Sequence, residues 1–214
     1  MNTHRPPRGQ LCIWTDVDPA HELDFNRWYD REHMQERVAI PGFQSARRFQ
    51  AIGSCPRPYL ALYYTDDIAV FRSDAYRNAF ANQTQWSLRN FERMRGTQRR
   101  VGELALELGQ AGGEGGSLAA FVVPEGRVAL ERLREALAKV AGADHVIRAS
   151  MLRTDPALSA PVTPNTPPVP ADWMVTIEAT QSEVAFDQAS ALAKSLELAP
   201  GGVYAFRLLW RLGA

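Results

Sequence analysis

The chain is short of cysteine, of net charge and of long apolar segments. Among its 214 residues the only cysteines are Cys12 and Cys55, and their spacing matches no metal or redox motif. We expect two reduced thiols, as is usual in the cytoplasm, although one bond between them stays an alternative. No apolar stretch approaches the roughly 20 residues of a membrane span, and the polar N-terminal segment MNTHRPPRGQ has no apolar signal core.

Opposite charges balance, with 24 basic and 24 acidic side chains. Nucleic acids and anionic membranes both favour a basic surface, so neither is expected as a partner. The Gly-rich stretch 109–116 lacks the Lys-Ser/Thr pair of a phosphate loop, and a strand pattern follows it. No dinucleotide fingerprint or nucleophile elbow is present. These absences predict a soluble, cytoplasmic globular protein.

The order of predicted elements repeats along the chain. The first half reads as strand, helix, strand, strand, helices and strand, at 11–17, 24–40, 43–52, 59–65, 68–81, 85–94 and 99–108. The second half repeats the order at 118–123, 128–140, 145–153, 173–180, 184–196 and 203–212. Two consecutive βαββαβ units predict an α+β fold of tandem ferredoxin-like repeats. Because each sheet would leave one face bare, we expect the two sheets to pack as one intrachain α+β barrel.

The domain boundaries follow from this repeat. Residues 10–108 form the first predicted repeat, 109–116 a Gly-rich connector and 117–213 a second, degenerate repeat. The second repeat contains a Pro-rich loop at 156–171, which cannot join a sheet ladder.

The first helix carries an unusual set of polar residues. Asp24 is its expected N-cap, and Pro41-Gly42 ends it. On a wheel of about 100° per residue, Glu32 and Glu36 fall in the middle of the apolar face. Buried carboxylates need cations or a raised pKa. One member of each pair Arg47/Arg48 and Arg99/Arg100 could reach this face, since neighbouring strand residues point to opposite sides. A salt bridge that only docks the helix on the sheet is the structural alternative.

His33 is the expected proton-transfer residue, because its unperturbed pKa lies near neutral pH. Tyr29 would orient a substrate oxygen, and Glu32 would set the histidine tautomer. The expected substrate-binding residues are two arginines and three aromatic side chains: Arg37, Arg48, Trp14, Tyr76 and Trp86. The alternative is a packing histidine with ordinary core aromatics around it. We expect no metal, because His33 with two carboxylates has no second ligand-bearing helix to complete a site.

The segment WYDREHMQERVAIPGF (28–43), the Ala-Arg-Arg at 46–48, Tyr59-Leu60, Asp74-Ala75-Tyr76 and Trp86 resemble the EthD-type proteins of the dimeric α+β barrel superfamily. More narrowly, they resemble a bacterial branch whose helix reads W-Y-x-x-E-H-x-x-E-R before P-G-F. The resemblance covers about residues 10–107, and in the second half only the order of elements is shared. Gln35 departs from the branch, which often has Pro there.

The superfamily includes cofactor-free monooxygenases, lactone isomerases, polyketide cyclases and haem-handling enzymes. The resemblance therefore implies the fold and leaves the chemistry open. It favours a cofactor-independent isomerase, lyase or monooxygenase acting on an aromatic or lactone-like metabolite, with its single site in the first half. The alternative is a non-catalytic protein that binds a pathway intermediate or a haem-like ligand. Association of two chains as a homodimer is left open.

Overall fold

The computed structural model describes residues 6–160, 171–199 and 201–213. The first half of the chain forms β1 (Gly9–Val17), α1 (Glu22–Trp28), α2 (Met34–Val38), β2 (Phe43–Ala51), β3 (Tyr59–Thr65), α3 (Asp74–Ala81), α4 (Gln85–Arg93) and β4 (Met94–Gly109). The second half forms β5 (Ser117–Pro124), α5 (Leu130–Ala141), β6 (Val146–Thr154), β7 (Asp172–Ala179), α6 (Ser182–Ser195) and β8 (Tyr204–Gly213). Short 3₁₀ turns lie at Pro19–His21 and Ile68–Arg72, and a π-helical turn lies at Tyr29–His33.

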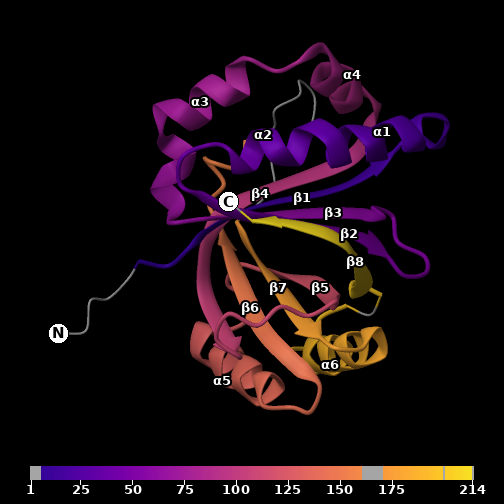
Figure 1. Cartoon of the computed structure of the whole chain (residues 1–214). Coiled ribbons are helices and arrows are strands. Elements are labelled where there is room, and N and C mark those ends of the chain that lie inside the picture. The colour runs from indigo at the N-terminus through magenta and orange to yellow at the C-terminus, as the bar shows by residue number, and fades with distance from the viewer. Residues whose placement is uncertain (1–5, 161–170, 200, 214) are drawn as a thin grey trace.

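The eight strands close into one barrel in the order β1-β3-β2-β8-β5-β7-β6-β4. Each half supplies a block of four strands, β4-β1-β3-β2 and β8-β5-β7-β6, and the blocks meet at β2–β8 and β4–β6. All of these strand pairs are antiparallel. Helices α1–α4 cover the barrel on one side and α5 and α6 on the other (Figure 1). The fold is therefore a mixed α+β fold around a closed eight-stranded barrel.

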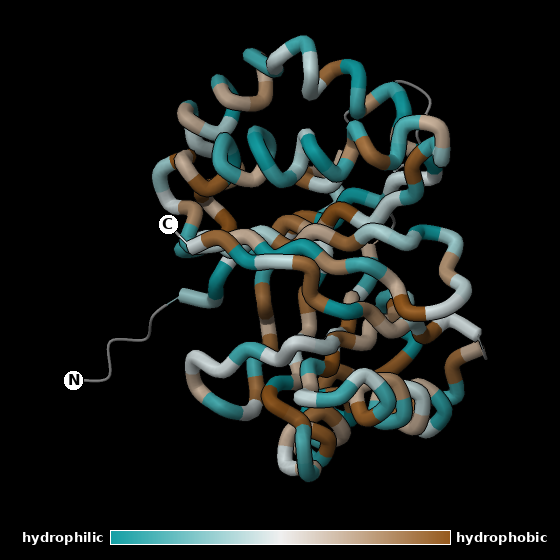
Figure 2. The backbone as a smooth tube through the Cα atoms, turned by 45° about the vertical axis from the view of Figure 1, so that its right-hand side comes forward, coloured by the Kyte–Doolittle hydropathy of each residue, from teal (hydrophilic) through white to brown (hydrophobic). Residues whose placement is uncertain are grey.

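The strands separate three apolar cores. One lies between the first-half strands and α1–α4, one inside the barrel, and one under α5 and α6. All seven residues of β3 are buried, because both faces of that strand are covered. The hydropathy colouring accordingly shows apolar stretches along the strands and polar stretches on the outer turns of the helices (Figure 2).

Several predicted boundaries shift for local reasons. The helix predicted over 68–81 is interrupted at Ser73, whose extended backbone ends the 3₁₀ turn and whose hydroxyl caps α3. Thr84 caps α4 by accepting from the Ser87 amide. Asp24 is not the N-cap that we expected, because α1 already begins at Glu22. The strand predicted over 99–108 begins earlier, at Met94, directly after α4.

Three remaining predictions concern the Pro-rich loop, the two cysteine thiols and membrane-spanning segments. The Pro-rich loop is described up to Ala160, where Ser159 is buried and bonds Val101; residues 161–170 lie outside the described ranges. Cys12 and Cys55 are both free thiols. Within the described ranges, no helix is long and apolar enough to cross a bilayer.

Candidate functional site

The helical segment between β1 and β2 contains a π-helical turn, which changes the direction in which its later side chains point. Helical backbone continues from α1 through Tyr29–His33 into α2. The wider turn sets the buried ring of His33 five residues after that of Trp28, and the buried side chain of Arg37 follows one turn later. Such turns are rare and frequent at functional sites. The buried face beyond Trp28 therefore contains His33 and Arg37.

The carboxylates predicted for that face lie beside it instead. Glu32 accepts a hydrogen bond of 2.6 Å from the Thr84 hydroxyl. The Glu36 side chain is 33% exposed, and its nearest cation is Arg37 at 3.9 Å. Burial, and then the charge of Glu32, raises the pKa of Glu36. The predicted central position of the two carboxylates is wrong, because the wheel assumed an unbroken α-helix.

His33 is enclosed by aromatic rings. Its ring centroid lies 4.2 Å from that of Trp28, 5.3 Å from Tyr29, 5.8 Å from Phe91 and 6.4 Å from Tyr63. Nδ1 is buried without a hydrogen-bond partner among the described residues. Burial, followed by the charges of Arg37 and Arg48, lowers the pKa of His33 well below 6.5. The imidazole is therefore neutral at physiological pH.

Two phenols share this layer. Burial raises the pKa of Tyr29 to about 12 and that of Tyr63 well above 10. The Tyr63 hydroxyl is buried beside that of Tyr29, and within the described part of the chain it has no partner at full hydrogen-bond geometry. Both phenols are therefore protonated and can act as hydrogen-bond donors.

Two arginines bring positive charge into this layer, and the carboxylates that they contact, Asp30 and Glu36, are partly exposed. The Arg48 guanidinium lies 4.3 Å from the centroid of the Tyr29 ring and donates to Asp30 at 3.1 Å and Asn26 at 2.5 Å. Burial lowers the pKa of Arg48. Arg37 donates at 3.4 Å to a backbone carbonyl of α3. The Nε atoms of both arginines are buried and unpaired over the residues that the structure describes.

The second half of the chain also contributes to this layer. Trp210 of β8 donates to Asp30 at 2.8 Å, and its ring packs against the same core. The pair formed by Asp30 and Arg48 is thus held from both halves.

Of the three aromatic side chains predicted to bind substrate, Tyr76 and Trp86 lie on the same side of the sheet as His33. Tyr76 stacks on Phe43 at 6.1 Å and accepts from Arg99 at 3.0 Å. Trp86 donates to Asp24 at 3.2 Å. Trp14 lies on the other face of β1, inside the barrel, where its indole donates to the Arg57 carbonyl at 2.7 Å. Trp14 therefore does not line the layer around His33.

Sequence analysis did not place Tyr63 or Phe91 beside His33. Both look like ordinary core positions in a strand and a helix, and nothing local marks them. The alternation of β3 could have indicated that Tyr63 shares a sheet face with Tyr59 and Ala61. The position of Phe91 depends on how α4 packs across α1, which short-range pattern does not encode.

The arrangement offers a neutral proton acceptor, two phenolic donors and two cations in an apolar layer. In the described part of the chain, no three His, Cys, Asp or Glu side chains lie close enough to hold a metal ion.

The second half contains an apolar cavity. It measures about 350 Å³ and lies between β5 and the end of α6. Arg127 and Glu197 are the charged residues in its lining.

The closed barrel with helices on two sides is the fold of the dimeric α+β barrel proteins. No protein-family model and no curated protein matches the chain. Among solved structures, an anthrone oxidase-like protein is 11% identical, with a TM-score of 0.63 over 100% of this chain and 96% of that one.

Two further solved structures share the fold. A monooxygenase candidate from Fusobacterium nucleatum is 8% identical, with a TM-score of 0.57 over 99% and 96% of the two chains. A chlorite dismutase from Candidatus Nitrospira defluvii is 8% identical, with a TM-score of 0.56 over 94% and 90%. At such identities the likeness shows the fold alone.

Proposed function

We propose that the protein is a cofactor-independent enzyme that binds an aromatic or lactone-like metabolite between α1–α4 and the first-half strands. The supporting observation is a group of buried polar atoms that have no geometric hydrogen-bond partner among the described residues: His33 Nδ1, the Tyr63 hydroxyl and the Nε atoms of Arg37 and Arg48. Each such atom costs about 1–3 kcal/mol, and native proteins usually satisfy it with protein, water or ligand. Four in one layer favour a site that a polar ligand completes.

His33 would accept a proton from an acidic hydroxyl or C–H group of the substrate. Proton transfer would place an imidazolium beside two arginines, which its lowered pKa opposes. The step therefore needs the substrate anion to remain close, where it would face Arg37 and Arg48. The phenols of Tyr29 and Tyr63 would donate to the oxygen on which the charge develops. Glu32, bonded to Thr84, would fix the helix flank rather than the histidine tautomer.

The candidate reaction classes for this enzyme are isomerase, lyase and monooxygenase. Two structural neighbours are described as anthrone oxidase-like and as a monooxygenase candidate. These names favour oxygenation of a ring system, as an analogy of fold.

We also propose that the barrel arose from tandem ferredoxin-like repeats at 10–108 and 117–213, joined by the connector 109–116. The equivalent strand orders of the two blocks support this division. We propose in addition that the chain is EthD-like, that its single site lies in the first half, and that two chains associate as a homodimer.

The second candidate is a non-catalytic binding protein. A haem-like ligand fits the residues around His33 poorly, because four aromatic rings have centroids within 6.4 Å of the imidazole centroid. A macrocycle could not approach the imidazole unless those rings moved. A small flat ligand is the better fit for this layer.

A thermal-shift screen of wild type and His33→Ala tests the site. The panel contains phenols, aromatic acids, lactones and haem, and exposed His145→Asn serves as the control variant. We expect a phenol or lactone to stabilise wild type and the control, and to stabilise His33→Ala less. Turnover of that compound, lost in His33→Gln, would distinguish an enzyme from a binding protein. Equal stabilisation of all three proteins would contradict a site at His33.

A further inference from the structure

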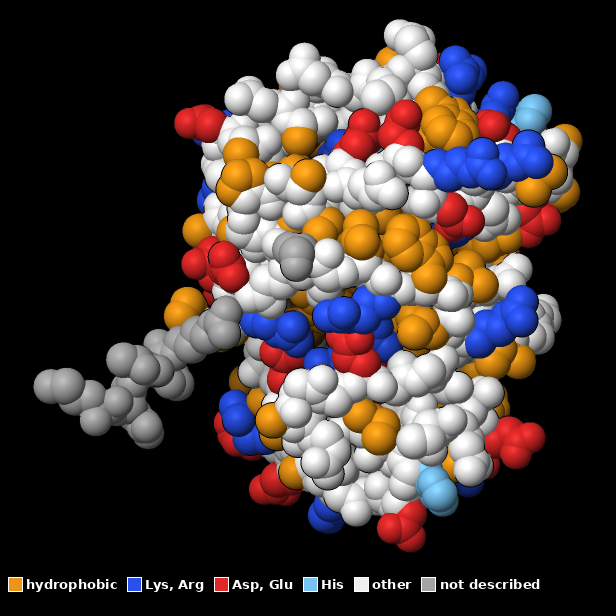
Figure 3. Space-filling model, viewed as in Figure 1, with side chains coloured by type: hydrophobic (Ala, Val, Ile, Leu, Met, Phe, Trp, Pro, Cys, Tyr) orange, Lys and Arg blue, Asp and Glu red, His pale blue; other side chains and the backbone are white. Residues whose placement is uncertain are grey.

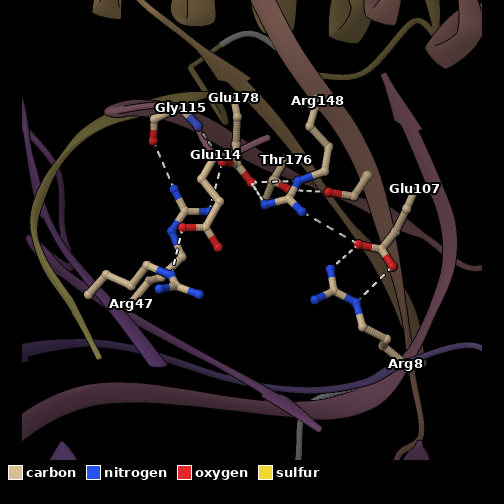
Figure 4. A network of polar contacts seen from close by, with 10 residues as sticks. Arg8, Arg47, Glu107, Glu114, Gly115, Arg148, Thr176 and Glu178 are labelled. Atoms are coloured by element: carbon tan, nitrogen blue, oxygen red, sulfur yellow. Dashed lines mark hydrogen bonds and ion pairs between the residues drawn. The ribbon is translucent and has the colours of Figure 1, made fainter. Parts of the chain in front are cut away.

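A network of charged side chains occupies one mouth of the barrel, on the face of the strands away from His33. Arg47 of β2, Glu178 of β7, Arg148 of β6, Glu107 of β4 and Arg8, just before β1, point toward one another (Figure 4). Basic and acidic side chains also gather at the waist of the surface, between the lobe of α1–α4 and that of α5 and α6 (Figure 3). The network thus runs from the barrel interior to its rim.

Glu178 lies at the centre of the network and is 1% exposed. One carboxylate oxygen accepts from Arg47 at 2.7 Å and from the Gly115 amide at 3.0 Å. The other accepts twice from Arg148, at 2.8 and 3.1 Å. Four donors therefore converge on this single carboxylate, and two fully charged guanidiniums share it.

Glu107 forms the outer part of the network. It binds Arg8 through both of its oxygens, and it lies 3.8 Å from Arg148. The side chains of Arg8 and Glu107 are 25% and 28% exposed, so this part of the network is open to solvent.

The charges of the network do not balance. Three guanidiniums face two carboxylates, and the additional pair of Arg211 with Glu114 at 2.7 Å is neutral. The side chains outside the described ranges include no Asp or Glu. At the other end of the interior, by contrast, Arg100 and Asp172 pair one to one at 2.8 Å.

The excess charge is costly because it lies largely inside the barrel. Arg47 is completely buried, and its Nε has no partner among the described residues. A buried charge without a counter-charge destabilises a fold strongly unless an anion accompanies it. Guanidinium groups match oxyanions particularly well, since their donors lie in one plane.

We propose that the barrel mouth binds a small oxyanion, either a carboxylate or inorganic phosphate, between Arg8, Arg47 and Arg148. The anion neutralises the excess charge and receives hydrogen bonds from donors that the two glutamates leave free. Arg47 and its neighbour Arg48 point to opposite faces of β2, so this site is separate from the layer around His33. It does not depend on the function proposed above.

Thermal shift and calorimetric titration test the site with sodium phosphate and sodium benzoate, at constant ionic strength set by a bulky organic sulfonate. For wild type we expect a saturable rise in Tm of roughly 5–10 °C at a hundredfold excess over Kd. A response to phosphate only would assign the inorganic oxyanion, and a response to benzoate only would assign a carboxylate.

Two variants that change the net charge of the network in opposite directions make the test specific. Arg8→Gln removes one of the three guanidiniums, the partly exposed one at the rim, and should weaken anion binding at least tenfold. Glu107→Gln raises the excess charge and should tighten it. Exposed Arg132→Gln on α5 is the matched control and should change nothing. No saturable response in wild type, or equal affinity in wild type, Arg8→Gln and Glu107→Gln, would overturn the proposal.

Discussion

Protonation of His33 gives the sharpest test of its environment. Burial among aromatic rings, and then the charges of Arg37 and Arg48, lowers the pKa of its imidazole well below 6.5 in the folded protein. In the unfolded chain the same side chain titrates near its ordinary pKa of about 6.5. Below that pH, the unfolded chain takes up a proton that the folded protein refuses. The free energy of unfolding must therefore fall as the pH falls from about 6.5 toward the folded pKa, and level off above about pH 7.5.

The size of the effect is limited by the one proton involved. A difference of one bound proton changes the free energy of unfolding by at most about 1.4 kcal/mol per pH unit. Between pH 6.5 and 5.0 the wild type should lose up to about 2 kcal/mol through His33 alone. His33→Gln removes the titrating group and should lack this loss.

Urea unfolding followed by tryptophan fluorescence, in half-unit steps from pH 5.0 to 7.5, measures the difference between the two proteins. Groups other than His33 titrate in both chains and cancel in the difference. Exposed His145→Asn should behave like wild type. A difference between wild type and His33→Gln that stays constant over this range would show that the imidazole is not held neutral, and would remove the basis for its role as a proton acceptor.

Three further predictions concern the barrel. Gly102→Ala would place its Cβ 1.9 Å from a carbonyl oxygen of β6, so it should cost about 3 kcal/mol or more in chemical unfolding, whereas exposed Gly116→Ala, with no atom within 4 Å, should cost under about 0.5 kcal/mol. Glu178→Gln would leave two buried guanidiniums without their carboxylate and should destabilise the protein by about 3 kcal/mol; an unchanged urea midpoint would show that the network contributes no net stability. Trp14→Phe removes a hydrogen bond inside the barrel and should lower Tm, but calorimetry should find the same Kd for a ligand of the helix-side layer, and a weaker Kd would contradict the separation of the two faces.

The sequence predicted the strands and their order well, because each strand is a short apolar run bounded by turn residues. It also predicted that Arg47 and Arg48 point to opposite faces, since neighbouring strand residues must alternate. Their partners were beyond reach. Glu178 lies 131 residues from Arg47 along the chain, and only closure of the barrel brings the two together.

The helix shows where sequence reasoning failed and why. The residue types of the layer were recognised, but a wheel of constant period placed Glu32 and Glu36 where His33 and Arg37 lie. One π-helical turn accounts for the error, because its extra residue rotates all later side chains. No residue in Tyr29–His33 marks that turn by its own propensity. Trp14 was misplaced for a simpler reason: an aromatic residue in a strand covered on both faces carries no sign of which face it occupies.

The closed barrel explains how the first half keeps several buried polar atoms unpaired. Eight antiparallel strands without a free edge form a continuous ladder, so neither block depends on its own helix layer alone. The layer under α5 and α6 is built mainly from aliphatic side chains and provides conventional apolar burial. One chain with two unlike halves can therefore hold the polar layer in one half and an ordinary apolar layer in the other. A symmetric pair of identical halves would carry the same polar layer twice and the cost of its unpaired atoms twice.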